Sequence, residues 1–488
     1  MSAPAARRPA AAGPAPAATG TRRSIALLAV LLAMFMDLLD TTIVNVALPS
    51  IHKDLGGPYS TVQWIAAAYT LTFGTALVTG GRLGDIAGRK RLFLLGTAGF
   101  TLASLACGLS QTSGELVGFR AAQGLAAAMM VPQVLSVIQT MFPPDQRGKA
   151  FAAFAGLAGL ATVGGPILGA VLTSGNIAGL GWRSIFLVNV PVGAATLVLA
   201  AVFVPESTAP GAKRLDLPGV ILSSGALLAL TYPLIQGQSL GWPPWTFASM
   251  GASAALLAAF ILQQRTRARR AGSPLVQLSL FRHKSFAGGL LINLLFMGAV
   301  TGFFLVLALY LQVGLGFSVL RSGLTTIPWG LLVPVFAGIG AGALAPKLGR
   351  PVLQAGLVLD IAAMAGLMLT TGHWHVTSFT LIPAFAIGGT GMGLVVAPLL
   401  DFSLADVPVA DAGSASGLYN TIQQAGAAIG IGGIGSLFLA CTSGKIPSPA
   451  TYSPAFQHTL WIPLAAFAAA LLATFLMPRQ APHRENIA

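Results

Sequence analysis

Three charged residues interrupt long apolar stretches of the chain. Asp37 and Asp40 lie in the run FMDLLDTTIVNVALP, and Arg120 lies in LVGFRAAQGLAAAMM. A charged side chain inside hydrocarbon is energetically costly, and such residues usually line a substrate pathway or relay protons. Two acids and one base within apolar stretches therefore predict proton handling or the recognition of a charged substrate.

The depth of these charges follows from helix geometry. The first apolar stretch ends near Pro49 and the fourth begins near Gly114. Asp40 then lies roughly 13 Å and Arg120 roughly 9 Å from the same membrane face. We predict that they pair, directly or through water, and that substrate arrival breaks the pair and favours proton uptake. Asp37 shares a helix face with Asp40. It would meet the substrate or a second proton, or else line a solvated inner vestibule.

The composition is that of a membrane protein. The chain has 488 residues, of which 55% are hydrophobic and only 8% are charged, whereas soluble domains contain about 25% charged residues. Its net charge of +14 is scattered over short loops, so nucleic-acid binding is not expected. Residues 1–23 are rich in Ala and Pro and indicate a disordered cytoplasmic tail. Cys107 and Cys441 are expected to be buried thiols without a disulfide.

Runs of about 20 apolar residues mark the membrane-spanning helices. They predict fourteen spans, at 24–47, 60–80, 92–110, 115–141, 149–173, 184–204, 217–236, 244–264, 285–311, 322–345, 351–371, 377–400, 413–440 and 457–477.

The basic residues orient these spans. Most of the 27 Lys and Arg residues lie in the segments on the same side as the N-terminus; Lys53, Arg183, Arg321 and Lys445 lie on the other side. Because basic residues gather in cytoplasmic loops, both termini are predicted to be cytoplasmic. This bias also requires an even number of spans.

A repeat divides the chain. The loop Gly81–Arg89 recurs as Gly342–Arg350, with Gly, Leu, Gly and Arg at the same spacing, although Asp85 is replaced by Pro346. Repeated halves are common in transporters. The predicted units are a six-helix bundle, two inserted helices with a basic cytoplasmic loop, a second six-helix bundle and a cytoplasmic tail, at 24–204, 205–284, 285–477 and 478–488.

The first copy of this loop could act as a conformational latch. Its glycines, Gly81 and Gly88, permit a sharp turn and close helix approach. Its charges, Asp85 and Arg89, can interact with helix ends or with each other. The alternative is a basic loop that serves only to orient the protein in the membrane.

Several runs resemble one protein family. The loop GRLGDIAGRK resembles the signature loop of the major facilitator superfamily, and Arg120 with Gln123 is similar to its fourth-helix motif. Gly165, Pro166 and Gly169 resemble its antiporter motif. The runs from Leu39 to Pro49 and around Trp182-Arg183 and Asn189-Val-Pro191 are similar to the fourteen-helix drug:proton antiporters. The resemblance implies an all-α fold of two six-helix bundles plus two central helices.

Two departures from the family pattern narrow the expectation. Ala161 and Ala170 stand where the antiporter motif usually has glycine, which puts bending at those points in doubt. The thirteenth span contains amides and no acid, which disfavours dicationic substrates. The predicted cavity residues are Asp37, Asn45, Gln123, Asn293, Asn420, Gln423 and Gln424. The last four could instead serve packing or interfacial anchoring.

Other titratable residues are given structural roles. Asp360 lies in the middle of a span and is expected to pair with a neighbouring polar group rather than couple protons. His373 and His375 lie in an outer loop with too few partners for a metal. We predict no metal and no cofactor.

These observations predict a bacterial cytoplasmic-membrane transporter and not an enzyme. It would be a monomeric proton-coupled antiporter that exports drug-like or antibiotic molecules by alternating access and confers resistance. Its partners are the drug, protons and the bilayer. The chain has no phosphate-binding G-x-x-x-x-G-K-[ST] run, which disfavours an ATP-driven pump. The alternatives are an exporter of lipid or envelope precursors, or a nutrient symporter of the same fold; a membrane sensor is least favoured.

Overall fold

The structure is a computed structural model. It describes residues 20–142, 144–208, 216–270, 275–373, 375–407 and 412–480, and all regular structure in these ranges is helical. Most of the two predicted tails, 1–23 and 478–488, lies outside these ranges. Thirteen helices in the described ranges are long and apolar enough to cross a membrane. The remaining predicted span, 149–173, lies on the 32-residue helix α5. The prediction of an all-helical membrane protein is therefore confirmed, with thirteen to fourteen candidate spans.

The first half of the chain forms the N-bundle, which comprises helices α1 to α7. Their bounds are α1 Gly20–Leu55, α2 Ser60–Ala87, α3 Arg89–Leu109, α4 Ser113–Met141, α5 Pro144–Gly175, α6 Ser184–Leu187 and α7 Asn189–Phe203. Helix α1 packs against α4, α5 and α7, and α4 packs against α2 and α3. The first helix continues past its predicted end, because Pro49 removes only one backbone N–H from it.

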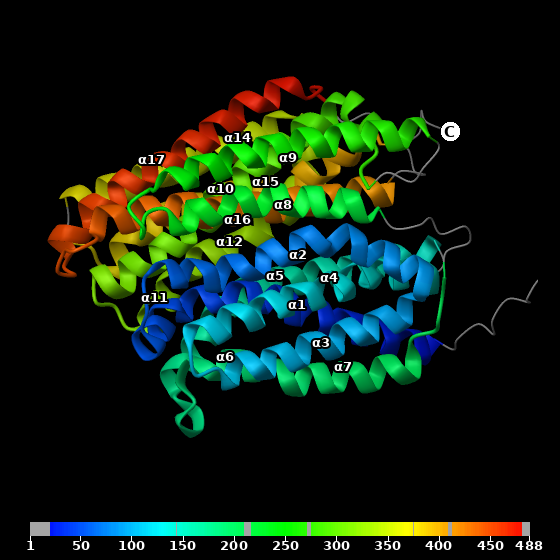
Figure 1. The fold of residues 1–488 in the computed structure, drawn as a ribbon, viewed down its shortest axis with the longest axis horizontal. Helices are drawn as coiled ribbons and strands as arrows, with labels where there is room; N and C mark the ends of the chain where they lie inside the picture. Colours follow the sequence, from blue (N-terminus) through cyan, green and yellow to red (C-terminus); the bar gives the residue numbers. More distant parts are fainter. Residues whose placement is uncertain are drawn as a thin grey trace, which may run out of the picture.

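The second half forms the C-bundle, which comprises α10 to α17. Their bounds are α10 Lys284–Leu309, α11 Val319–Thr325, α12 Ile327–Ile339, α13 Ala345–Leu348, α14 Pro351–His373, α15 Ser378–Leu404, α16 Ala412–Thr442 and α17 Pro449–Ala473. Helix α10 packs against α15, α16 and α17, and α15 packs against α12 and α14. The two bundles lie side by side, the N-bundle below and the C-bundle above in the first view (Figure 1).

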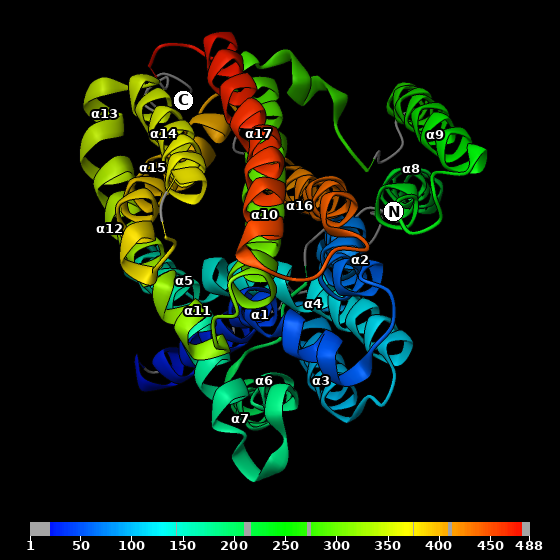
Figure 2. The same cartoon turned by 90° about the vertical axis from the view of Figure 1, so that its left-hand side faces the viewer.

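Two further helices, α8 (Leu217–Gln236) and α9 (Pro244–Arg269), form the inserted pair between the bundles in sequence. Helix α8 contacts α9, and it also contacts α2 of the N-bundle and α16 of the C-bundle. Figure 2 shows α8 beside these two helices, with α9 outside it. The inserted pair therefore covers one flank of the boundary between the bundles.

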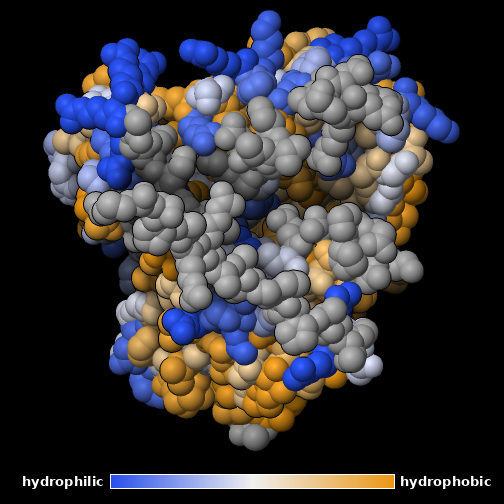
Figure 3. Space-filling view, turned by 90° about the vertical axis from the view of Figure 1, so that its right-hand side faces the viewer, coloured by the Kyte–Doolittle hydropathy of each residue, from blue (hydrophilic) through white to orange (hydrophobic). Residues whose placement is uncertain are grey.

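The two ends of the molecule differ. We call the end with the loop between α1 and α2 the loop end, and the opposite end, where the described chain begins and finishes, the termini end (Figure 1). Figure 3 looks onto the termini end, where hydrophilic residues are concentrated, whereas the flanks are hydrophobic. Apolar flanks around this polar end match a protein that spans a bilayer.

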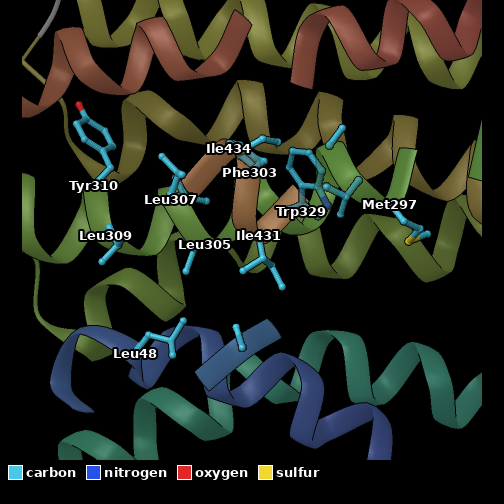
Figure 4. Close-up of a cluster of buried hydrophobic side chains, with 14 of the residues drawn as sticks. Leu48, Met297, Phe303, Leu305, Leu307, Leu309, Tyr310, Trp329, Ile431 and Ile434 are labelled. Carbon is cyan, nitrogen blue, oxygen red and sulfur yellow. The ribbon is translucent and has the colours of Figure 1, made fainter. Parts of the chain in front are cut away.

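Contacts join the bundles toward the loop end. Gln312 Nε2, just after α10, donates to Val46 O of α1 over 2.8 Å. A Cβ on Gly323 of α11 would lie 2.7 Å from Ala170 Cβ of α5, so these helices also touch. Buried apolar side chains of both bundles also form one shared core. Figure 4 shows Leu48 of α1 facing Leu305 and Ile431 of the C-bundle across the boundary.

Candidate functional site

A buried ion pair joins α1 to α4. Arg120 Nη1 donates to Asp40 Oδ2, and the two residues are 2% and 0% exposed. The structure thus brings together the two residues whose depths predicted a pair. Removing one partner of such a buried pair typically costs about 3–5 kcal/mol, since the other charge stays uncompensated.

Amide and hydroxyl side chains complete the surroundings of Asp40. Gln123 Nε2 donates to Asp40 Oδ1 over 2.9 Å and to Ser104 Oγ over 2.8 Å, and Gln123 Oε1 accepts from Arg120 Nη1 over 2.6 Å. Asn189 Nδ2 donates to Asp40 Oδ1 over 3.2 Å. Four helices, α1, α3, α4 and α7, therefore hold one carboxylate. Such a network fixes its position until a proton or a substrate changes the charge.

Arg120 also connects this network to Asp37. Its Nε donates to Ile65 O over 3.2 Å, and its guanidinium carbon lies 4.5 Å from the centre of the Tyr69 ring. The Tyr69 hydroxyl donates to Asp37 Oδ1. Asp37 is therefore linked to Asp40 through an aromatic ring and a guanidinium, and both acids lie on α1 one turn apart.

Apart from Asp37, the predicted cavity residues separate into two groups. Gln123 and Asn293 are fully buried. Gln123 belongs to the Asp40 network, and Asn293 Nδ2 donates to Tyr419 O over 3.0 Å. Both lie buried within a bundle, where each amide joins two helices. The half-buried group comprises Asn45, Asn420, Gln423 and Gln424.

Sequence reasoning missed two members of the site. Ser104 and Asn189 were given no role at Asp40, although the run Asn189-Val-Pro191 had been noted for its family resemblance. The available signal was a polar residue inside an otherwise apolar helix. That signal does not say which neighbouring helix the side chain faces.

The antiporter-motif glycines bring α5 against α1 next to Asp40. A Cβ on Gly165 would lie 1.9 Å from Thr42 Oγ1, and one on Gly169 would lie 2.7 Å from Ile43 Cγ1. Both contacts fall on the turn that follows Asp40. Ala161 and Ala170, which replace motif glycines, are fully buried, so these positions serve packing. Helix α5 therefore contacts the helix that carries Asp40 directly.

The predicted latch loop joins α2 to α3 and reaches α7. Arg89 Nη2 pairs with Asp85 Oδ1 over 2.9 Å. The backbone N–H of Arg89 donates to Ser207 O over 2.9 Å, and that of Lys90 donates to Glu206 Oε1 over 3.1 Å. Glu206, just beyond α7, was not singled out from the sequence. The fourth predicted latch residue, Gly81, lies in α2 with Pro132 Cβ 3.6 Å from its own Cβ position.

Gly88→Ala should destabilise the protein by about 1–2 kcal/mol or more. Gly88 has a φ of 109°, which L side chains adopt at that cost, and an added Cβ would lie 2.7 Å from Glu206 Oε1. A lower melting temperature in detergent would show the loss. Gly114→Ala is the matched control, because a Cβ there meets nothing within 4 Å. Equal melting temperatures for the two variants would contradict this account of the loop.

Asp360 does not pair as predicted. It is fully buried in α14, and neither carboxyl oxygen has a hydrogen-bond partner among the residues that the structure covers. A Cβ on Gly391 of α15 would lie 2.7 Å from Asp360 Oδ1. The acid therefore sits in a narrow space at a glycine of the neighbouring helix, away from the Asp40 network of the N-bundle.

Asp360→Asn should retain transport and leave the melting temperature unchanged or higher. An unpaired carboxylate in an apolar site is costly, and the amide has nearly the same shape without the charge. Transport assays and thermal unfolding of the purified variant would check both points. Loss of transport in a folded variant would instead give Asp360 a role in coupling.

Comparison with known proteins places this arrangement in a family. The model of the Major Facilitator Superfamily matches residues 30–431. The chain belongs to this superfamily. It is 43% identical over 445 residues to the probable actinorhodin transporter of Streptomyces coelicolor, covering 91% of this chain and 76% of that protein. It is 34% identical over 466 residues to the puromycin resistance protein of Streptomyces alboniger, covering 93% and 90%.

Solved structures agree on the fold. A bacterial homologue of the human lysosomal transporter Spinster, in an inward-facing and occupied conformation, matches with a TM-score of 0.67 at 16% identity. The match covers 94% of this chain and 97% of that chain. The predicted superfamily and the expectation of a multi-pass membrane transporter rather than an enzyme are confirmed.

Within the described ranges, no three His, Cys, Asp or Glu residues are grouped as a metal site would require.

Proposed function

We propose that this member of the superfamily is a proton-coupled antiporter. It exports drug-like or antibiotic molecules across the bacterial cytoplasmic membrane by alternating access and confers resistance to them. The observation that carries this proposal is the buried Asp40–Arg120 pair, held by Gln123 and placed beside the antiporter-motif contact at Gly165. The printed functions of relatives support it, since they include actinorhodin transport, puromycin resistance and cephamycin export.

The exchange would use the alternative partners of Arg120. When Asp40 takes up a proton, the ion pair loses its charge attraction, but Arg120 keeps Gln123 Oε1, Ile65 O and the Tyr69 ring. Arg120 is therefore not left without partners in the protonated state. Asp37 would meet the substrate or a second proton through its link to Tyr69. Because α5 touches α1 next to Asp40, a change at the pair would shift the contact between these helices.

The proposed substrate class rests on the polar residues of α16. Amides on α16, Asn420, Gln423 and Gln424, are half-buried, and α16 has no acid. We propose uncharged or singly charged apolar molecules, which would not need a second carboxylate. We also propose that both termini are cytoplasmic, that the protein acts as a monomer, and that residues 24–204 and 285–477 are the moving units around the insertion 205–284.

Inverted membrane vesicles with an acidified interior provide the test. Ethidium, a monovalent cation, should accumulate in vesicles that contain the protein, and a protonophore should abolish the accumulation. Failure with ethidium in folded protein would direct the assay to neutral antibiotics and then to envelope lipids, which would favour the precursor-exporter alternative. Release of preloaded substrate from the vesicles together with protons would favour a symporter and contradict the proposal.

A further inference from the structure

We propose that the inserted pair forms a third wall of the gate at the loop end. In this inference, α8 covers the contact between α2 and α16, which we call the seam. It moves with α16 when the gate opens. The inference rests on the proposed function for the opening motion itself. It assigns a task to two helices that lie outside the six-helix bundles.

The seam contains a buried amide. Gln63 of α2 is 1% exposed. Its Nε2 donates to Ile431 O over 3.1 Å, to Gly432 O over 3.3 Å and to Ser436 Oγ over 3.3 Å, all on α16. Its Oε1 is buried without a hydrogen-bond partner in the described part of the chain. A bond between the bundles that leaves one acceptor unsatisfied is weaker than a complete one, which suits a contact that must reopen.

Helix α8 attaches to the same turn of α16. The Ser436 hydroxyl, which accepts from Gln63, donates to Leu234 O of α8. A Cβ on Gly432 would lie 3.2 Å from Leu234 Cβ. The same residues of α16 therefore hold α2 on one side and α8 on the other.

The contact between α8 and α2 at this end is made by rings. Tyr232 of α8 and Trp64 of α2 have ring centres 5.6 Å apart, and Trp245 of α9 lies 5.8 Å from Tyr232. Ring contacts of this kind bury apolar area without a directional bond. We therefore expect α8 to separate from α2 and to stay hydrogen-bonded to α16.

The other end of α8 is fixed to the C-bundle side as well. Asp216, fully buried at its N-cap, accepts from Gln264 Nε2 of α9 over 2.8 Å and from Leu275 N, before α10, over 3.1 Å. Burial alone would raise the pKa of Asp216, but hydrogen bonds from Gln264, Gly219 and Gln263 hold its pKa below the usual value. The carboxylate is thus charged at neutral pH.

This anchor also places the pivot of the motion. Asp216 Oδ1 also pairs with Arg267 Nη1 of α9 over 3.2 Å, which keeps α8 and α9 together at the termini end. At the loop end, α8 and α2 meet through the Tyr232–Trp64 ring contact, with no hydrogen bond between them among the residues that the structure describes. The gate would therefore open at the loop end while α8 stays attached to α9 at the termini end.

A thiol behind the gate can report its opening. Ile431 points from α16 toward the N-bundle (Figure 4) and is almost fully buried. Ile431→Cys would be introduced into a Cys441→Ala background. An impermeant maleimide would be added from the loop-end side in the absence of substrate, and the rate of thiol labelling measured. Cys107 remains in this background and is buried. Its labelling in the Cys441→Ala protein, without the Ile431 substitution, gives the background rate.

Two variants should open the gate. Ser436→Ala removes the bonds to Gln63 and to Leu234 O, and Tyr232→Ala removes the ring against Trp64. Each should speed labelling of the thiol introduced by Ile431→Cys about three- to tenfold, the change expected from losing one such contact. Ser253→Ala is the matched control, since this buried serine of α9 donates to Ala226 O of α8 over 2.7 Å, inside the pair. It should leave the rate unchanged.

Labelling that rises with Ser436→Ala but not with Tyr232→Ala would overturn the inference, because α2 and α16 alone would then form the seam. A disulfide between Leu234→Cys and Gly432→Cys provides a second measurement that does not depend on the alanine variants folding. It should form and leave transport intact, since α8 moves with α16, and arrest of transport would contradict this. Transport in the same vesicles, measured with ethidium and then with neutral antibiotics, separates the two proposals: graded labelling without transport of any of these substrates would reject the proposed function and keep the gate.

Discussion

Asp40→Asn should reduce proton-driven accumulation of substrate to the background of empty vesicles. The variant keeps the size of the side chain and loses the charge that pairs with Arg120, so the site could no longer bind and release a proton. Gln123 Oε1 and Ile65 O would still accept from Arg120, which limits the destabilisation. The measurement is ethidium accumulation in acid-loaded inverted vesicles, with the amount of protein in the membrane quantified alongside.

Two controls separate coupling from folding. Asp54→Asn, on the same helix, removes the carboxylate of an ion pair with Arg183 whose aspartate side chain is 49% exposed; exposed pairs contribute about 1 kcal/mol at most, so transport should persist. Energy-independent exchange of preloaded substrate by Asp40→Asn should also persist, because the exchange needs no net proton movement. Full proton-driven transport by Asp40→Asn would make Asp40 a structural residue.

The sequence predicts how deep a residue lies in the membrane better than it predicts which neighbouring helix the side chain faces. The rise along a helix placed Asp40 and Arg120 at similar depth, and the structure joins them. The same reasoning could not show that Gln123 and Asn189 turn toward Asp40, because helices that are apolar all round carry no periodic signal for which neighbour they face. Asp360 illustrates the same limit, since its depth was predicted but the glycine of α15 beside it was not.

The seam at Gln63 was missed for a related reason. In the sequence, Gln63 looks like any single polar residue near the start of a span. Its partners are backbone oxygens and Ser436, far along the chain, and backbone acceptors have no signature in sequence. Contacts of this kind depend on how two bundles meet, which the motifs of each bundle do not specify.

Gly165→Ala should destabilise the protein by about 1–3 kcal/mol and abolish transport. The added Cβ would lie 1.9 Å from Thr42 Oγ1 and 2.8 Å from Thr42 Cβ, so α5 would be forced away from the helix that carries Asp40. Overpacking of this kind has that typical cost, and it exceeds the gain in helix propensity of about 1 kcal/mol. Because α5 links the antiporter motif to the ion pair, the displacement should impair coupling as well as stability.

The neighbouring glycine provides a control at the same position along the helix. A Cβ on Gly164 would meet nothing within 4 Å, so Gly164→Ala should keep transport and raise stability by up to about 1 kcal/mol through helix propensity. Thermal unfolding and vesicle transport of the two variants, measured together, decide the point. If both alanines are tolerated equally, the α5–α1 contact is looser than the structure has it. If both abolish transport while only Gly165→Ala lowers the melting temperature, bending of α5, rather than its contact with α1, is the property that the motif supplies.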